Sequence, residues 1–153
     1  MALKPDRNYA MGVDISHFMN TAASERGIIV IVDTSTTGVG ASMDDGRAVA
    51  AIPTGTTGAP IGMLMTKVVN YDLTRQHLNE HQDEVQIGSK VTIMTNGWAV
   101  TDQIAAGITP APGEAAHFTT DGKLTNVTTS TQVGKFVSGK DSDGYAKIAI
   151  NLP

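Results

Sequence analysis

Residues 89–102 read Ser89-Lys-Val-Thr-Ile-Met-Thr-Asn-Gly-Trp-Ala-Val-Thr-Asp102, two alternating runs around Asn96-Gly97. An Asn-Gly pair between alternating runs is the strongest short-range signal of a β-hairpin. We therefore expect a tight two-residue turn that places Thr95 opposite Trp98. This register would give the hairpin one apolar face and one face rich in hydroxyl groups.

Outward from this stretch, the sequence predicts more short strands. The preceding run, Ile61-Gly-Met-Leu-Met-Thr-Lys-Val-Val-Asn-Tyr71, is apolar on both faces, as expected of a strand at a sheet centre or against a subunit interface. Further short strands and turns alternate about every ten residues. They cover residues 27–33, 47–52, 114–119, 123–127, 133–137 and 145–152. This pattern predicts an all-β fold, a small β-barrel or sandwich of about 7–9 short strands.

The first 24 residues have a different character. Pro5 and Gly12 interrupt any helix, yet the segment is too apolar for a solvated tail. We expect residues 1–24 to form an extended N-terminal arm and residues 25–153 to form a single β-barrel domain. The arm needs a surface to cover its apolar side chains, either on its own domain or on another subunit. Its apolar side chains include Tyr9, Met11, Val13 and Phe18.

Composition narrows the possible functions. Hydrophobic residues make up 41% and charged residues 17% of the chain, which excludes wholesale disorder. With no cysteine, the chain has no disulfide, thiolate metal site or cysteine nucleophile. The formal charge of -4 and scattered basic residues argue against nucleic acid as a partner. The longest apolar run, residues 28–32, is too short to cross a bilayer, so we expect a soluble protein made in the cytoplasm, with no membrane partner.

One stretch resembles the motif of a zinc hydrolase. His77-Leu-Asn-Glu80-His81 has the spacing of inverted zinc metallopeptidases, in which two histidines bind zinc and the glutamate activates water. That chemistry needs a stable helix and a third ligand from a second helix. Here the motif lies in a polar insertion, residues 72–84, between predicted strands. We interpret the insertion as an exposed loop and keep the zinc hydrolase as a remote alternative.

Other candidate motifs favour turns over chemistry. Asp141-Ser-Asp143-Gly144 has the first acidic positions of a calcium loop but lacks its continuation, so it is typical of a turn. The glycine loops at 37–42 and 55–62 lack the Gly-Lys-Ser/Thr ending of phosphate-binding loops and are expected to be connectors. We predict no catalytic, cofactor-binding or metal site, and therefore no enzyme and no cofactor.

The order of these parts resembles a known family. Its most specific pieces are a hairpin, Gly113-Glu-Ala-Ala-His-Phe-x-x-Asp-Gly-Lys-Leu-Thr-Asn126, and a closing segment, Val133-Gly-Lys-Phe-Val-Ser-Gly-Lys-Asp-Ser-Asp-Gly-Tyr-Ala-Lys-Ile148. Together with the apolar arm and the Gly27-Ile-Ile-Val-Ile-Val32 entry strand, they resemble the head decoration proteins, or structural cement proteins, of tailed phages. The similarity runs from about Gly27 to Leu152.

This resemblance implies a function that composition does not. It implies a compact β-barrel that assembles with itself, often as a homotrimer, on the outer surface of the capsid and stabilises neighbouring major capsid protein subunits. The resemblance also implies an N-terminal arm that lies along the shell, and we expect Tyr9, Met11, Val13 and Phe18 to contact the capsid or a neighbouring subunit. The alternative is another virion β module, such as a tail or fibre adaptor or a carbohydrate-binding module, which would need an aromatic platform around Trp98.

Overall fold

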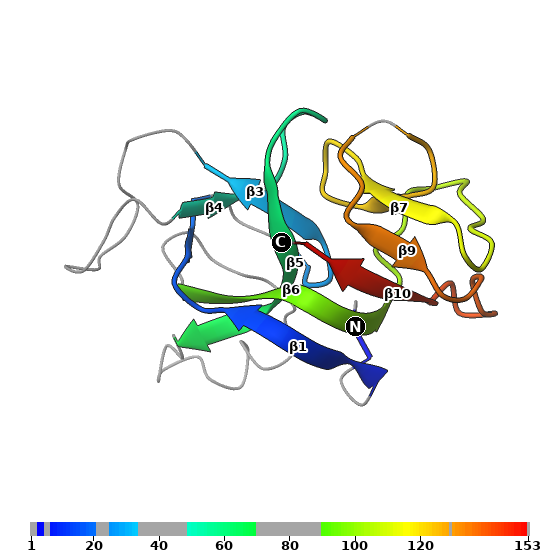
Figure 1. Cartoon of the computed structure of the whole chain (residues 1–153), viewed down its shortest axis with the longest axis horizontal. Coiled ribbons are helices and arrows are strands. Elements are labelled where there is room, and N and C mark those ends of the chain that lie inside the picture. Colours follow the sequence, from blue (N-terminus) through cyan, green and yellow to red (C-terminus); the bar gives the residue numbers. More distant parts are fainter. Residues whose placement is uncertain are drawn as a thin grey trace.

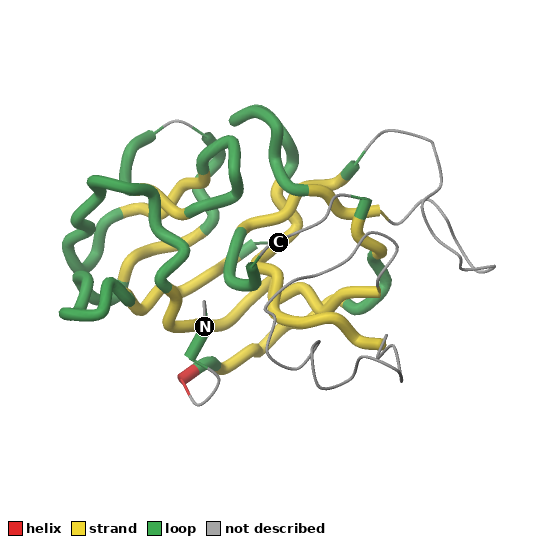
Figure 2. Tube along the Cα trace, turned by 180° about the vertical axis from the view of Figure 1, so that it is seen from behind, coloured by secondary structure: helices red, strands yellow, loops and turns green. Residues whose placement is uncertain are grey.

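The computed structural model describes residues 3–4, 7–20, 25–33, 49–69, 90–128 and 130–152. For residues 66–69 it describes the backbone only. The all-β prediction is confirmed: strands joined by loops make up the fold, and the described residues contain no α-helix, only a single 3₁₀ position at Arg7 (Figures 1 and 2). The strands are β1 (Tyr9–Asp14), β2 (Phe18–Met19), β3 (Ile29–Val32), β4 (Val49–Ala51), β5 (Pro60–Val69), β6 (Lys90–Thr101), β7 (Ala115–Phe118), β8 (Leu124–Thr125), β9 (Gly134–Phe136) and β10 (Ala146–Asn151).

Strand β6 organises the molecule. Along one edge it pairs first with β5 and then with β10. The N-terminal segment lies along its other edge, from a bridge between Leu3 and Thr101, through β1, to Phe18 opposite Lys90. In Figure 1, β6 runs between the side of the molecule that holds β3 and β4 and the side that holds β7 and β9. One long strand is therefore shared by both halves of the fold.

The first half is a closed five-stranded barrel. Its strands follow the order β2-β4-β3-β5-β6, and β2 closes the ring by pairing with both β4 and β6. The β2–β4 pair is parallel, whereas the other pairs are antiparallel. Aliphatic side chains fill one of the two hydrophobic cores, which is made of Met19, Ile28, Val30, Ala50, Leu64, Val91 and Ile93.

The second half extends the sheet in the order β6-β10-β9-β7-β8. Its inner face carries the larger core, which also takes Ile29 from β3 and Met63 from β5. Alternate residues of β3 and β5 thus point into different cores, because successive side chains of a strand lie on opposite faces. This explains the apolar residues at 61–65, and the predicted place of the run at a sheet centre is confirmed, since β5 lies between β3 and β6.

The tight hairpin predicted at Asn96-Gly97 is wrong. Strand β6 continues through both residues, and each of them pairs with β1 on one edge and with β10 on the other. Trp98, which the hairpin would have paired within the same stretch, pairs with Tyr9 and Ala149. Ladder partners from distant parts of the chain therefore outweigh the local turn preference.

Close packing explains why a glycine occupies position 97. Its φ is +145°, and a Cβ there would lie 2.2 Å from the carbonyl oxygen of Tyr9 and 2.9 Å from the Sδ atom of Met94. No larger residue fits at position 97, where the backbone of β1 lies so close to β6. Gly97 thus permits two strands to approach each other, and it makes no turn.

Several other predictions are confirmed. The hairpin at Asp121-Gly122 joins β7 and β8, with Gly122 at a φ of +74°. Strand β10 places Ala146, Ile148 and Ile150 on its buried side. Of the connector predicted at 55–62, residues 55–59 form a loop, whereas residues 60–62 already belong to β5. The loop at 37–42 and the polar insertion at 72–84 lie outside the described residues. The boundary between arm and domain near residue 24 stays a prediction.

Candidate functional site

Three of the four residues predicted for a partner contact lie on β1. Tyr9, Met11 and Val13 are 58%, 71% and 48% exposed, and the neighbouring Ile15 is 52% exposed. The register places Ala10 opposite Gly97 and the following Gly12 opposite Asn96, so Met11 is the extra residue of a β-bulge. Bulges re-aim side chains at sheet edges. We call Tyr9, Met11, Val13 and Ile15 the apolar strip.

Phe18 has a different environment from the strip. It lies half-buried in β2, opposite Val49 of β4 and Lys90 of β6, where β2 closes the barrel. The ammonium of Lys90 sits 5.7 Å from the centre of the Phe18 ring, within the range of a cation–π contact. The structure therefore gives Phe18 a role in the barrel as well as partial access to solvent.

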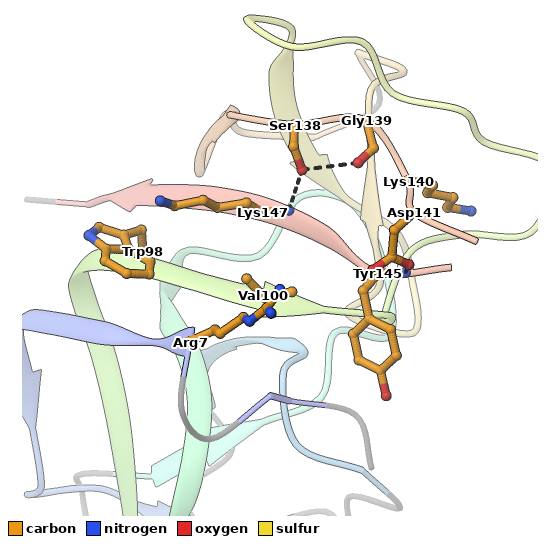
Figure 3. A pocket seen from close by; sticks show the side chains of 9 residues that line it. All are labelled: Arg7, Trp98, Val100, Ser138, Gly139, Lys140, Asp141, Tyr145 and Lys147. Carbon is orange, nitrogen blue, oxygen red and sulfur yellow. Dashed lines mark hydrogen bonds between the residues drawn. The ribbon is translucent and has the colours of Figure 1, made fainter. Parts of the chain in front are cut away.

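Beside the strip lies a cavity of about 600 Å³ that the sequence did not reveal. It opens between the N-terminal segment, β6, β10 and the loop that joins β9 to β10 (Figure 3). Its lining combines aromatic and aliphatic side chains with cationic ones. The lining residues are Arg7, Trp98, Val100, Ser138, Gly139, Lys140, Asp141, Tyr145 and Lys147. We call this the basic cavity.

Trp98 connects the basic cavity to the apolar strip. Its ring stacks against Tyr9, with centroids 6.2 Å apart and planes inclined by 28°. The Nζ atom of Lys147 lies 3.8 Å from the centre of the Trp98 ring, as the close-up in Figure 3 illustrates. Such cation–π contacts are worth about 0.5–1 kcal/mol at exposed sites. Together they hold the indole in place and occupy the ring face on which a sugar would stack.

The loop over the cavity is built around Asp141. One carboxylate oxygen of Asp141 accepts hydrogen bonds from the amides of Asp143 (3.0 Å) and Tyr145 (2.8 Å). The amide of Gly144, at a φ of +86°, donates to the Asp141 carbonyl at 3.0 Å. The predicted turn is thus confirmed. These bonds, the one from Tyr145 foremost, and the nearby Lys4 ammonium hold the pKa of Asp141 below its ordinary value of 3.8.

Lys4 attaches the start of the chain to this loop. Its Nζ atom lies 3.3 Å from the other carboxylate oxygen of Asp141 and 4.3 Å from the centre of the Tyr145 ring. Its amide donates to the carbonyl of Val100 at 3.1 Å. Ser138 supports the loop from the opposite side, since its hydroxyl accepts from the Lys147 amide at 2.9 Å.

The lining of the basic cavity has more positively charged than negatively charged side chains. Asp141 is the one carboxylate of the lining, and it pairs with Lys4. Arg7 and Lys147 line the same cavity, and neither forms an ion pair with any part of the chain that the structure describes. This local excess contrasts with the formal charge of -4 of the whole chain.

Both described histidines have local partners. The Nδ1 atom of His17 lies 3.2 Å from the Asp14 carboxylate, and that of His117 donates to the Ser130 carbonyl at 2.7 Å. Partial burial raises the pKa of Asp14, but hydrogen bonds from Ser16 and the charge of His17 outweigh it, so the pKa is lowered overall. Among the described residues, no group of three His, Asp or Glu side chains could hold a metal ion. The zinc pattern at 77–81 lies outside them.

The fold and its surfaces define a small β-barrel protein that presents an apolar strip and a basic, aromatic cavity. Within the described residues, no helix is long and apolar enough to span a membrane. A family model described as "Structural cement protein (E217 gp24/Pam3 gp6)" matches residues 7–151. The chain therefore belongs to this family of phage structural cement proteins, and the resemblance seen in the sequence is confirmed. Membership implies a structural role and association with the phage capsid. No curated protein matches the chain.

Proposed function

We propose that this protein binds the outer surface of the assembled phage head and stabilises contacts between major capsid protein subunits. The family match over residues 7–151 is the observation that carries this proposal. A protein that binds only the assembled shell adds its binding free energy to the stability of that shell. Repetition over many equivalent sites multiplies a modest contact. The protein would be made in the host cytoplasm and act without catalysis.

The apolar strip supplies part of the proposed contact. Tyr9, Met11 and Val13 expose about half or more of their surfaces on one strand, whereas most large apolar residues of the described chain pack into the two cores. Contiguous exposed apolar side chains typically mark a surface that a partner covers. Phe18 contributes less to this contact in our proposal, because β2 partly buries it.

The same contact could join subunits, and we propose that the protein assembles with itself as a homotrimer. Most homo-oligomers are closed rings of identical contacts, and a trimer is one such ring. Light scattering of the purified protein measures this directly. A mass of three chains would support the proposal, and a monomer at all concentrations would contradict it.

Co-sedimentation with phage heads that lack the protein tests the capsid contact. The variant Met11→Ser/Val13→Ser removes the centre of the strip and leaves Tyr9 on Trp98. Each apolar side chain of this size contributes about 1.5–3 kcal/mol when buried, so we expect binding to weaken at least about tenfold. Undiminished binding would refute the role of the strip.

A matched control uses exposed valines elsewhere. Val32 and Val127 are 41% and 50% exposed and lie outside the strip. The variant Val32→Ser/Val127→Ser should therefore bind heads like the unchanged protein. Heads carrying the unchanged protein should also melt at a higher temperature than bare heads, and an equal melting temperature would contradict the cement function itself.

A further inference from the structure

We propose that the basic cavity and the sheet face beside it bind an acidic, extended segment of a partner protein. On the function proposed above, that partner is the capsid shell. The binding chemistry stands on the cavity alone, and this separates the two proposals experimentally. The argument combines the shape of the sheet face, its charge and its aromatic floor.

The shape suits an extended chain that crosses the strands. Tyr9, Trp98, Ala149 and Lys135 pair in register across β1, β6, β10 and β9, so their side chains form one row on the outer face of the sheet. A second hollow of about 420 Å³ continues this row and is lined by Lys135 and Ala149. Adjacent strands lie about 4.8 Å apart, so the row spans about 14 Å, the length of roughly four extended residues.

The positive charge of this outer sheet face favours an anionic ligand. Arg7 and Lys147 line the basic cavity and Lys135 lines the second hollow. None of the three forms an ion pair within the described ranges. Arginine binds carboxylates through two parallel hydrogen bonds, and lysine binds them as a point charge. Carboxylate side chains therefore complement this face.

The cavity floor distinguishes an acidic peptide from other anions. Val100, Tyr145 and Trp98 give the floor apolar surface, which a phosphate or a sulfated sugar does not use but a peptide side chain does. The Trp98 ring already carries Lys147 and Tyr9, which leaves little room for sugar stacking.

The first test needs no capsid. Trp98 is the single tryptophan of the chain, so its fluorescence reports on the cavity alone. We expect a random copolymer of glutamate and leucine to change this fluorescence with a saturable dependence that weakens as salt is added. A lysine and leucine copolymer of similar length should have no effect. No saturable change with the acidic copolymer would overturn the proposal, and so would an equal response to polygalacturonate, which would indicate a polysaccharide site.

Charge-reversal variants then test whether the residues of the basic cavity bind the copolymer. Arg7→Glu and Lys147→Glu should each weaken copolymer binding about tenfold or more, the usual scale for a charge pair at an interface. Lys123→Glu is the matched control, because Lys123 is exposed in the turn between β7 and β8, away from both hollows. Arg7 is exposed outside the strands, so its reversal keeps the test valid should Lys147→Glu impair folding. Equal effects of all three variants would overturn the site.

Head binding by the same variants separates the two proposals. If Arg7→Glu loses both copolymer and head binding while Lys123→Glu keeps both, the cavity is the acidic-segment site used on the shell. If the unchanged protein binds the copolymer and ignores heads, the cavity proposal stands and the cement function fails. If Arg7→Glu and Lys147→Glu bind heads as well as the unchanged protein, the assignment of the shell as partner is refuted.

Discussion

The two faces of the sheet formed by β6, β10 and β9 differ sharply although the same strands make both. The inner face carries Phe136, Ile148 and Ile150, all at most 1% exposed and packed in the larger core. The outer face carries Trp98, Lys147 and Lys135, which surround two hollows. Alternation along each strand thus separates stability from recognition. Changes on one face should affect unfolding, and changes on the other should affect binding.

The largest expected effect comes from neighbouring residues of β9. Phe136→Ala empties part of the core and should lower the free energy of unfolding by about 3–5 kcal/mol. Lys135→Ala, one residue earlier on the outer face, should change it by no more than about 0.5 kcal/mol. Urea denaturation of both variants measures the difference. Similar losses for the two would show that the faces are not divided as described.

A smaller loss of stability is expected from a change at the place where β1 pairs closely with β6. Gly97→Ala places a methyl group against the carbonyl of Tyr9 and also strains the backbone at a φ of +145°. Gly107→Ala is the matched control, because its φ is also positive, at +76°, but no atom lies near the added methyl group. Backbone strain alone costs about 1–3 kcal/mol.

We expect the loss of stability to lie at the upper end of this range for Gly97→Ala, which adds a steric clash, and at its lower end for Gly107→Ala. Amide hydrogen exchange shows which strand the substitution destabilises. Faster exchange at Val13, whose strand must move, is expected in Gly97→Ala only. Unchanged amide exchange in β1 would mean that Gly97 is not required for the close pairing of β1 with β6.

The smallest effect is a dependence on pH at the rim of the basic cavity. Hydrogen bonds to Asp141 lower its pKa in the folded protein below 3.8, so the unfolded chain takes up this proton first as the pH falls. The carboxylate therefore stabilises the fold above pH 3.8 and loses that contribution as the pH drops through the lowered pKa. Asp141→Asn should flatten this part of the pH profile of unfolding. An identical profile in the variant would contradict the assignment.

Local patterns predicted much of this fold. The alternation in residues 145–152 predicted the buried side of β10, and Asp121-Gly122 predicted the β7–β8 hairpin. The hairpin at Asn96-Gly97 failed because the partners of those residues come from β1 and β10, far away along the chain. A propensity measured over a few residues carries no information about such pairing.

The apolar strip and the basic cavity also differ in how far the sequence could predict them. The apolar strip was predictable because Tyr9, Met11 and Val13 lie close together in sequence. The basic cavity was not, since Arg7, Trp98 and Lys147 meet only through the register of β1 and β10 on β6. The one local signal was Lys147, a charged residue between Ala146 and Ile148, which marks an outward-facing position on the last strand.

The shared strand β6 also sets when the protein can finish folding. Its partners stretch from Leu3 to Asn151, and the edge that pairs with β5 and β10 is not complete until β10 has been synthesised. Folds dominated by such distant pairings fold in about milliseconds to seconds, more slowly than helical bundles of similar size. During synthesis, the edge of β6 that β10 later covers stays open to other chains.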